Sequence, residues 1–152
     1  NETAGELLAR LAPLGADLLV QTVAAWERGE IIPMPQDSAL AAYCPQLKKE
    51  DGRLDFTQNA QSLHDRVRGL NPWPGAYALL GNMQVKFWRT ATAPLDKPAA
   101  PGECVLADPK RGLFVAAGEG ALQVLELQFP GAKRMSASAA LLGRPLAGQR
   151  FS

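Results

Sequence analysis

The sequence is poor in the residues that proteins use for metal binding and cross-linking. Its 152 residues contain one histidine, His64, and two cysteines, Cys44 and Cys104. Two cysteines so far apart form neither a disulfide framework nor a metal-ligand spacing, so both are interpreted as reduced thiols. No glycine-rich loop leads from a strand into a helix to bind phosphate. We therefore predict no catalytic, cofactor-binding or metal-binding residue in this chain.

Long apolar runs are also missing. The longest, at 18–26 and 122–127, are broken by polar residues and fall short of the roughly 20 residues that cross a bilayer. No basic segment precedes an apolar run and a small-residue cleavage site. The sequence thus predicts no membrane span and a cytoplasmic location. Because the first residue is Asn1 and not Met, the chain is interpreted as a fragment.

The charge of the chain changes sign along its length. The net charge is +1, with hydrophobic residues at 47% and charged residues at 20%, a composition typical of a folded protein. Residues 1–40 hold two arginines against six acidic residues, a net charge of −4, and the remainder holds 14 basic against 9 acidic residues, a net charge of +5. Such asymmetry is typical of a polyanion-facing module joined to an unrelated element, although a basic surface of this size also serves solubility alone.

The first 33 residues predict helices with one apolar face. Thr3 and Glu6 have the capping-box spacing, and Pro13 and Gly15 predict a break between a short helix and a longer one. Apolar residues recur near the helical period at Leu7, Leu11, Leu14, Leu18 and Trp26. We expect this face to dock on the following domain or on a second copy of the chain. Residues 34–53 have no sustained period and predict a linker.

The rest of the chain predicts a sheet with flanking helices. A short strand at 54–56 and a helix at 60–70 precede an irregular turn at 71–75. Strands are predicted at 76–80, 83–90, 103–107, 113–117 and 121–128, followed by a closing helix at 136–142 and a tail packed on the sheet. The apolar phase slips within 121–128, which predicts a bulge. We predict a mainly β fold with flanking helices: a small OB-like Greek-key barrel, preceded by an N-terminal helical segment and a linker.

Five segments, taken together, resemble the methionyl-tRNA formyltransferase family in order and spacing: 47–56, 66–70, 71–76, 85–88 and 133–137. The resemblance covers essentially the whole chain. It implies that 1–33 are the C-terminal helices of a truncated Rossmann-like formyltransferase domain. It further implies that 34–53 are an interdomain linker and that 54–152 are a C-terminal OB-like barrel domain.

The resemblance also implies an activity that this fragment alone lacks. The family transfers a formyl group from 10-formyltetrahydrofolate to the amino group of methionyl initiator tRNA in translation initiation. An Asn, a His and an Asp of the N-terminal domain perform the transfer, and that domain would lie upstream of Asn1. The implied partners are initiator methionyl-tRNA and the upstream catalytic domain of the same chain, with self-association through the N-terminal helices as a further expectation and no membrane.

Nine residues are candidates for tRNA binding, because basic side chains follow phosphates and exposed aromatic rings stack on bases. With Met83, Val85 and Phe87 in the core, Lys86 and Trp88 would point outward. The candidates are Lys48, Lys49, Arg53, Arg66, Arg68, Lys86, Trp88, Lys133 and Arg134.

Ordinary structural roles also fit these residues. Trp88 would equally pack under a neighbouring loop, and the basic residues would equally be solvated. Arg66 or Arg68 would pair with an acid such as Asp65 or Asp55. His64 is expected to be solvated or to cap its helix.

Two other functions remain open. One is the C-terminal part of a sugar-nucleotide formyltransferase or of a formyltetrahydrofolate-hydrolysing relative, which has no need of Lys48, Lys49, Lys133 and Arg134 together. The other is a stand-alone OB-type binding module. The apolar helical face argues against the second, since it would be left exposed without a partner.

Overall fold

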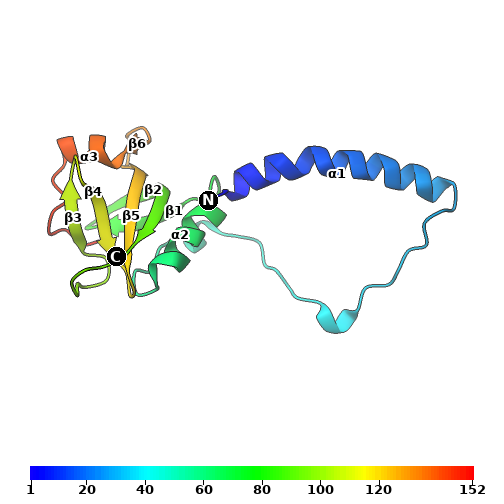
Figure 1. The fold of residues 1–152 in the computed structure, drawn as a ribbon, viewed down its shortest axis with the longest axis horizontal. Coiled ribbons are helices and arrows are strands. Elements are labelled where there is room, and N and C mark those ends of the chain that lie inside the picture. Colours follow the sequence, from blue (N-terminus) through cyan, green and yellow to red (C-terminus); the bar gives the residue numbers. More distant parts are fainter.

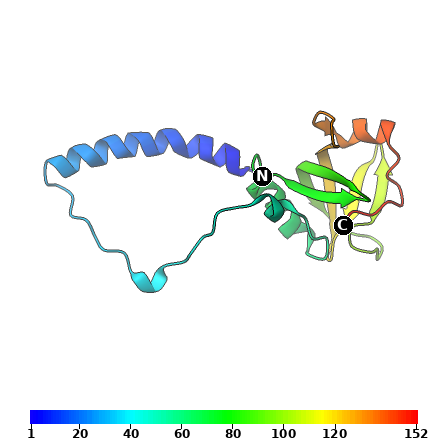
Figure 2. The ribbon, with the colours of Figure 1, turned by 180° about the vertical axis from the view of Figure 1, so that it is seen from behind.

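The computed structural model describes residues 1–152 and has two parts of different character (Figure 1). Helix α1 (Ala4–Glu27) projects away from a small domain that contains the whole sheet. The chain then returns to the domain through an irregular segment interrupted by a 3₁₀ turn, η1 (Ser38–Leu40). The reverse view shows that the outgoing and returning segments meet the domain close together (Figure 2).

Helix α1 begins at the predicted capping box. The Thr3 Oγ1 accepts from the Glu6 N–H at 3.3 Å, and Glu6 Oε2 accepts from the Thr3 N–H at 2.8 Å. The predicted break is wrong, because the helix continues through Pro13 and Gly15. Proline removes one hydrogen bond of the helical ladder, and the bonds on either side of Pro13 hold the helix together.

No residue of α1 is buried, so the expected docking of its apolar face on the domain is wrong. By length and composition α1 is also long and apolar enough to cross a membrane, which the broken apolar runs had not indicated. The mean hydropathy of α1 is high although a few charged residues interrupt its apolar residues. The same properties belong to a helix that packs one face in a protein core.

The sheet is antiparallel with strand order β1-β2-β5-β4-β3. Three hairpins, with β5 returning beside β2, give a Greek-key connection. The five main strands confirm the predicted ones, but 54–56 is not a strand, because only Arg53 bridges to Tyr77 there. The strands are β1 (Ala76–Leu80), β2 (Met83–Ala93), β3 (Cys104–Asp108), β4 (Gly112–Ala116), β5 (Ala121–Gln128) and the short β6 (Met135–Ser136), which pairs with β5.

The sheet is open, which corrects the expected barrel, since edge strands β1 and β3 do not pair with each other. The last residues of the chain span the gap between them. Leu79 and Ser152 exchange backbone hydrogen bonds of 2.8 and 2.9 Å, and the Phe151 N–H donates to the Gly102 carbonyl at 2.8 Å. A Cβ on Gly102 would lie 2.0 Å from the Phe151 oxygen, so this approach requires glycine.

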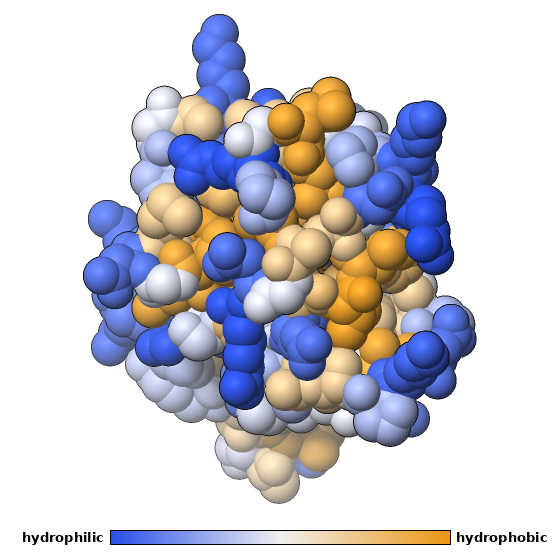
Figure 3. All heavy atoms as spheres, turned by 90° about the vertical axis from the view of Figure 1, so that its left-hand side faces the viewer, coloured by the Kyte–Doolittle hydropathy of each residue, from blue (hydrophilic) through white to orange (hydrophobic).

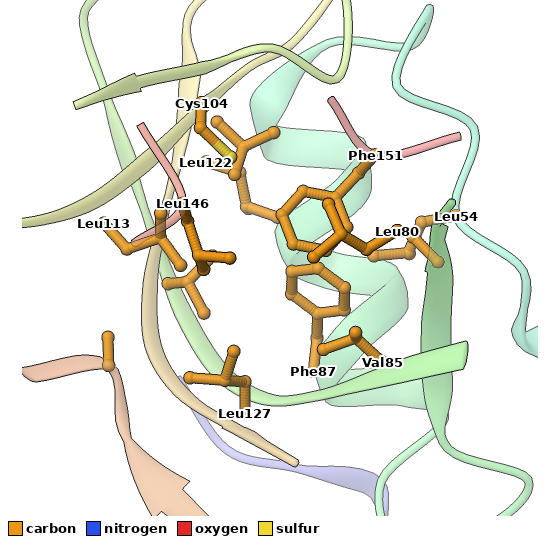
Figure 4. Packing of buried hydrophobic residues seen from close by; sticks show 14 of the residues in the cluster. Leu54, Leu80, Val85, Phe87, Cys104, Leu113, Leu122, Leu127, Leu146 and Phe151 are labelled. Carbon is orange, nitrogen blue, oxygen red and sulfur yellow. The ribbon is translucent and has the colours of Figure 1, made fainter. Parts of the chain in front are cut away.

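The core lies inside the curved sheet and is covered by two helices, α2 (Ala60–Gly69) and α3 (Ala137–Gly143). Figure 4 shows the core side chains in front of α2. Three phenylalanines meet at its centre, with ring centroids 5.3–6.3 Å apart: Phe56, Phe87 and Phe151. Met83, predicted in the core, is 37% exposed because it begins β2 at the hairpin turn. On the side facing away from α1, apolar side chains lie between charged ones (Figure 3).

Strands β2 and β5 shift register at their middle. Phe87 pairs with Leu127, Arg89 with Glu126 and Thr90 with Val124, so Trp88 and Leu125 have no partner in the ladder. This irregularity confirms the bulge predicted within 121–128. A bulge bends the strand and redirects the side chains beyond it.

Replacing Phe151 tests the role of the C-terminal residues. We expect Phe151→Ala to lower the free energy of unfolding of the domain by about 3–5 kcal/mol, because it removes a fully buried ring. Leu142→Ala is the control: Leu142 is 78% exposed, and the change should stay within about 0.5 kcal/mol. Urea unfolding followed by fluorescence measures both, and equal values for the two variants would contradict the packing described.

Candidate nucleic-acid interface

Trp88 is the centre of the densest group of candidate residues. Its indole Nε1 donates to Gln128 Oε1 at 3.0 Å, and Gln128 Nε2 donates to the Ala132 carbonyl at 2.9 Å. The ring is therefore half-buried beside the loop that follows β5. Trp88 thus packs against a neighbouring loop, which is the structural role expected for it. Through Gln128 its ring is linked to that loop.

Two cations lie over the Trp88 ring. The Arg134 guanidinium carbon is 5.3 Å from the ring centroid, and Lys86 Nζ is 5.9 Å from it. Both distances are within the range of cation–π attraction. Lys86 and Trp88 lie together, as the outward phase of β2 predicted. The structure adds Arg134, which the sequence had placed only in a separate loop, and Lys133 is exposed beside it.

Glu126 joins two arginines in this group. Its carboxylate accepts from Arg89 Nη1 at 2.9 Å and from Arg134 Nε. Burial alone would raise the pKa of Glu126, but hydrogen bonds from Arg134 and Arg89 outweigh it and lower the pKa. The carboxylate stays ionised and orients both guanidinium groups.

We call Lys86, Trp88, Arg89, Lys133 and Arg134 the Trp88 cluster. Its four cations and the one Glu126 carboxylate give a local charge of +3. Arg89 was not predicted from the sequence, because strict alternation from Phe87 would point it into the core. The bulge at Trp88 moves Arg89 outward, where it is exposed.

A second basic group lies where the linker joins the domain. Lys48 and Lys49 are exposed around the 3₁₀ helix η2 (Lys49–Gly52), and the Lys48 N–H donates to Asp51 Oδ2 at 2.7 Å. Arg53 lines a surface depression together with Arg150, which the sequence did not single out. Only the return of the C-terminal residues to the sheet brings Arg150 there.

Arg66 and Arg68 are engaged by the chain itself. Arg66 Nη2 donates to the Asp51 carbonyl, whereas Arg68 Nη1 donates to the Glu2 carbonyl at 2.8 Å. Arg68 also forms an ion pair with Asp65, which confirms that one of the two arginines pairs with that acid. Their side chains are half-buried and do not join the Trp88 cluster.

His64 is buried, which corrects its expected place at the surface. Only 8% of the residue is exposed, and Nδ1 lies 3.0 Å from Thr90 Oγ1. Burial, and secondarily the charge of Arg68, lowers the pKa of His64 from its ordinary value of 6.5. Leu63 and Val67 face the core, and His64 lies beside them against β2, so the ring is held by packing.

Comparison with known proteins identifies the class to which this domain belongs. Residues 46–145 match the formyl transferase C-terminal domain family, and the chain belongs to that family. A relative from Solibacter usitatus, "Methionyl-tRNA formyltransferase", is 49% identical over 138 residues, which are 91% of this chain and 43% of the relative. Relatives of the same name from Citrifermentans bemidjiense and a Janthinobacterium strain are 42% and 40% identical over 96% and 99% of this chain, and over 45% and 48% of their own lengths.

The chain therefore corresponds to a C-terminal part of such proteins and spans about half the length of the curated relatives it matches. Among solved structures, a variant of HypX from Aquifex aeolicus is similar with a TM-score of 0.64 and 17% identity, over 92% of this chain and 26% of that one. HypX in complex with tetrahydrofolic acid has a TM-score of 0.58 at 18% identity, over 82% and 22%. At these identities the likeness concerns the fold.

The lowered pKa of His64 predicts a loss of stability in mild acid. Below pH 6.5 His64 is protonated in the unfolded chain, whereas in the folded chain it binds a proton less readily. The free energy of unfolding should therefore fall as the pH drops through about 6.5. His64→Gln should remove this dependence between pH 7 and pH 5, because glutamine does not titrate. Urea unfolding at several pH values measures the slope, and parallel pH profiles for the parent and the variant would contradict the assignment.

Proposed function

We propose that this chain is the tRNA-holding part of a methionyl-tRNA formyltransferase. The whole enzyme would transfer a formyl group from 10-formyltetrahydrofolate to the amino group of methionyl initiator tRNA. The proposal is supported by membership of the formyl transferase C-terminal domain family and by the names of relatives 40–49% identical. In this proposal the chain binds and orients the tRNA, and the remainder of the enzyme catalyses the transfer of the formyl group.

The Trp88 cluster is the observation that carries the proposal. Lys86 and Arg134 are held over the Trp88 ring, and Arg89 and Arg134 by Glu126, so these cations lose little side-chain freedom when they meet phosphate oxygens. Phosphate contacts of this kind position a nucleic acid and do not read its sequence. A base could stack on Trp88 only by displacing a cation, and we therefore assign the ring to holding Lys86 and Arg134.

Lys48, Lys49 and Arg53 form the second part of the proposed surface. They lie at the point where the linker enters the domain, and no acidic side chain forms an ion pair with any of them. Exposed and unpaired cations are available to an RNA backbone and release counterions when it binds. Arg66 and Arg68 are half-buried and hold the carbonyls of Asp51 and Glu2.

The proposal places the folate cosubstrate, the catalytic residues and the amino-acid end of the tRNA outside this chain. Tetrahydrofolic acid is bound in a HypX structure whose fold this chain resembles. The partners are then initiator methionyl-tRNA and the catalytic domain of the same protein, and the location is the cytoplasm. Helix α1 would belong to that catalytic domain, with residues 34–53 as the linker between the domains.

The salt dependence of tRNA binding tests this proposal. Lys133→Ala with Arg134→Ala should weaken binding and reduce the slope of log affinity against log salt by roughly 1.4–1.8, at about 0.7–0.9 per phosphate contact. The measurement is a fluorescence titration of the chain with initiator tRNA at low and moderate salt, in a Trp26→Phe background.

A matched control removes the same charge elsewhere. Lys97 and Arg111 line one groove together with Ala93, the last residue of β2, whereas Lys86 lies near the start of that strand. Lys97→Ala with Arg111→Ala should leave the slope of log affinity against log salt nearly unchanged. Equal losses in both double variants would mean that only net charge matters. No binding at low salt would reject the proposed grip.

A further inference from the structure

The first turn of α1 is attached to the β domain although the rest of the helix is free of it. The Gly5 N–H donates to the Asn71 carbonyl at 2.9 Å, and Arg68 Nη1 donates to the Glu2 carbonyl at 2.8 Å. Asn71 is in turn held on the sheet, because its Nδ2 donates to the Trp88 carbonyl at 3.2 Å. Helix α1, the turn after α2 and strand β2 are thus linked through one residue, Asn71.

The approach is too close for a side chain at position 5. A Cβ on Gly5 would lie 2.7 Å from Cδ of Pro72, a ring atom with little freedom to move. Gly15, ten residues further along the same helix, has no atom within 4 Å of its Cβ position. The close packing is therefore confined to the first turn of α1.

The returning linker is fastened to helix α2 and to strand β1. Arg66 Nη2 donates to the Asp51 carbonyl, and the Leu54 N–H donates to the Tyr77 carbonyl at 2.8 Å. Arg66 and Arg68 are two residues apart on α2. The excursion formed by α1 and the linker therefore begins and ends against α2, as both ribbon views show (Figures 1 and 2).

We infer that α2 and the turn after it form a joint that fixes the direction in which α1 leaves the β domain. We call the contacts of Gly5, Arg66, Arg68, Asn71 and Pro72 the α2 joint. Its arginines act as positioning residues, each holding a backbone carbonyl of one crossing segment. Whatever packs on the exposed apolar face of α1 is thereby held at a set orientation to the Trp88 cluster. The inference concerns geometry within the chain and does not require that the chain bind tRNA.

Distance measurements between spin labels test the joint. Nitroxides are attached at Gln21→Cys on α1 and Gln84→Cys on β2, both exposed, in a Cys44→Ser background. Cys104 is buried, and burial raises the pKa of its thiol to about 12, so it does not take the label. Pulsed electron–electron double resonance then reports the distribution of distances between the two labels.

We expect one narrow distance peak in the parent and a broadened or shifted distribution for Gly5→Ala. Gly15→Ala is the matched control: it makes the same substitution in the same helix, raises helix propensity in the same way and should leave the distribution unchanged. Arg68→Met should also broaden the distribution, whereas Arg111→Met should not. The unfolding midpoint of the β domain should be the same in all variants, which separates loss of positioning from loss of folding.

Three results would overturn the inference. These are a broad distribution in the parent, equal distributions for Gly5→Ala and Gly15→Ala, and an Arg68→Met variant that matches Arg111→Met. Failure of tRNA binding would leave these distances as expected, so the joint and the proposed function fail independently.

Discussion

Strand β2 pairs with both β1 and β5, and its register against β5 shifts at Trp88. Its first half pairs with β1 and its second half with β5 alone, and the bulge between them bends the strand. Phe87, before the bulge, enters the aromatic core, and Thr90, after it, meets His64 on α2. If Trp88 were paired in a regular ladder, strict alternation would point Arg89 into the core and Thr90 out of it.

The same bulge creates the electrostatic character of the outer face. It leaves Trp88 outside the ladder, free to cover the loop after β5 and to receive Arg134 and Lys86 on its ring. It also turns Arg89 toward Glu126, which Arg134 shares. Exposed ion pairs of this kind add little stability, so their value lies in orienting cations that would otherwise sample many rotamers. A surface of oriented cations suits a ligand recognised by its backbone charge.

The N-terminal helix has the opposite character. Its apolar side chains are exposed along its length, and it touches the domain only at its first turn. An exposed apolar stripe of this size marks an interaction surface. The relatives are about twice as long as this chain and so contain further residues outside the matched part. The contacts of Gly5 and Arg68 hold the helix to the β domain at its first turn and leave the apolar side chains further along it exposed.

Much of the local structure follows directly from the order of the residues. A capping box, hairpin turns and apolar alternation place the start of α1, the helix α2 and the main strands within a few residues, and the slip of apolar phase in β5 predicts the bulge. The ordered segments from 47–56 to 133–137 indicated the family that the comparison then showed. Basic residues in the outward phase of β2 indicated Lys86 and Trp88 as neighbours, because alternation in a strand is a local rule.

Tertiary structure alone decided the contacts between distant segments. The burial of His64, the outward turn of Arg89 and the position of Arg150 each depend on packing between elements far apart in sequence. Arg66 and Arg68 appear in the sequence as two more cations, but the structure uses them to hold Asp51 and Glu2. Periodicity reports which face of an element is apolar, and it contains no information on which distant carbonyl or ring that element will meet.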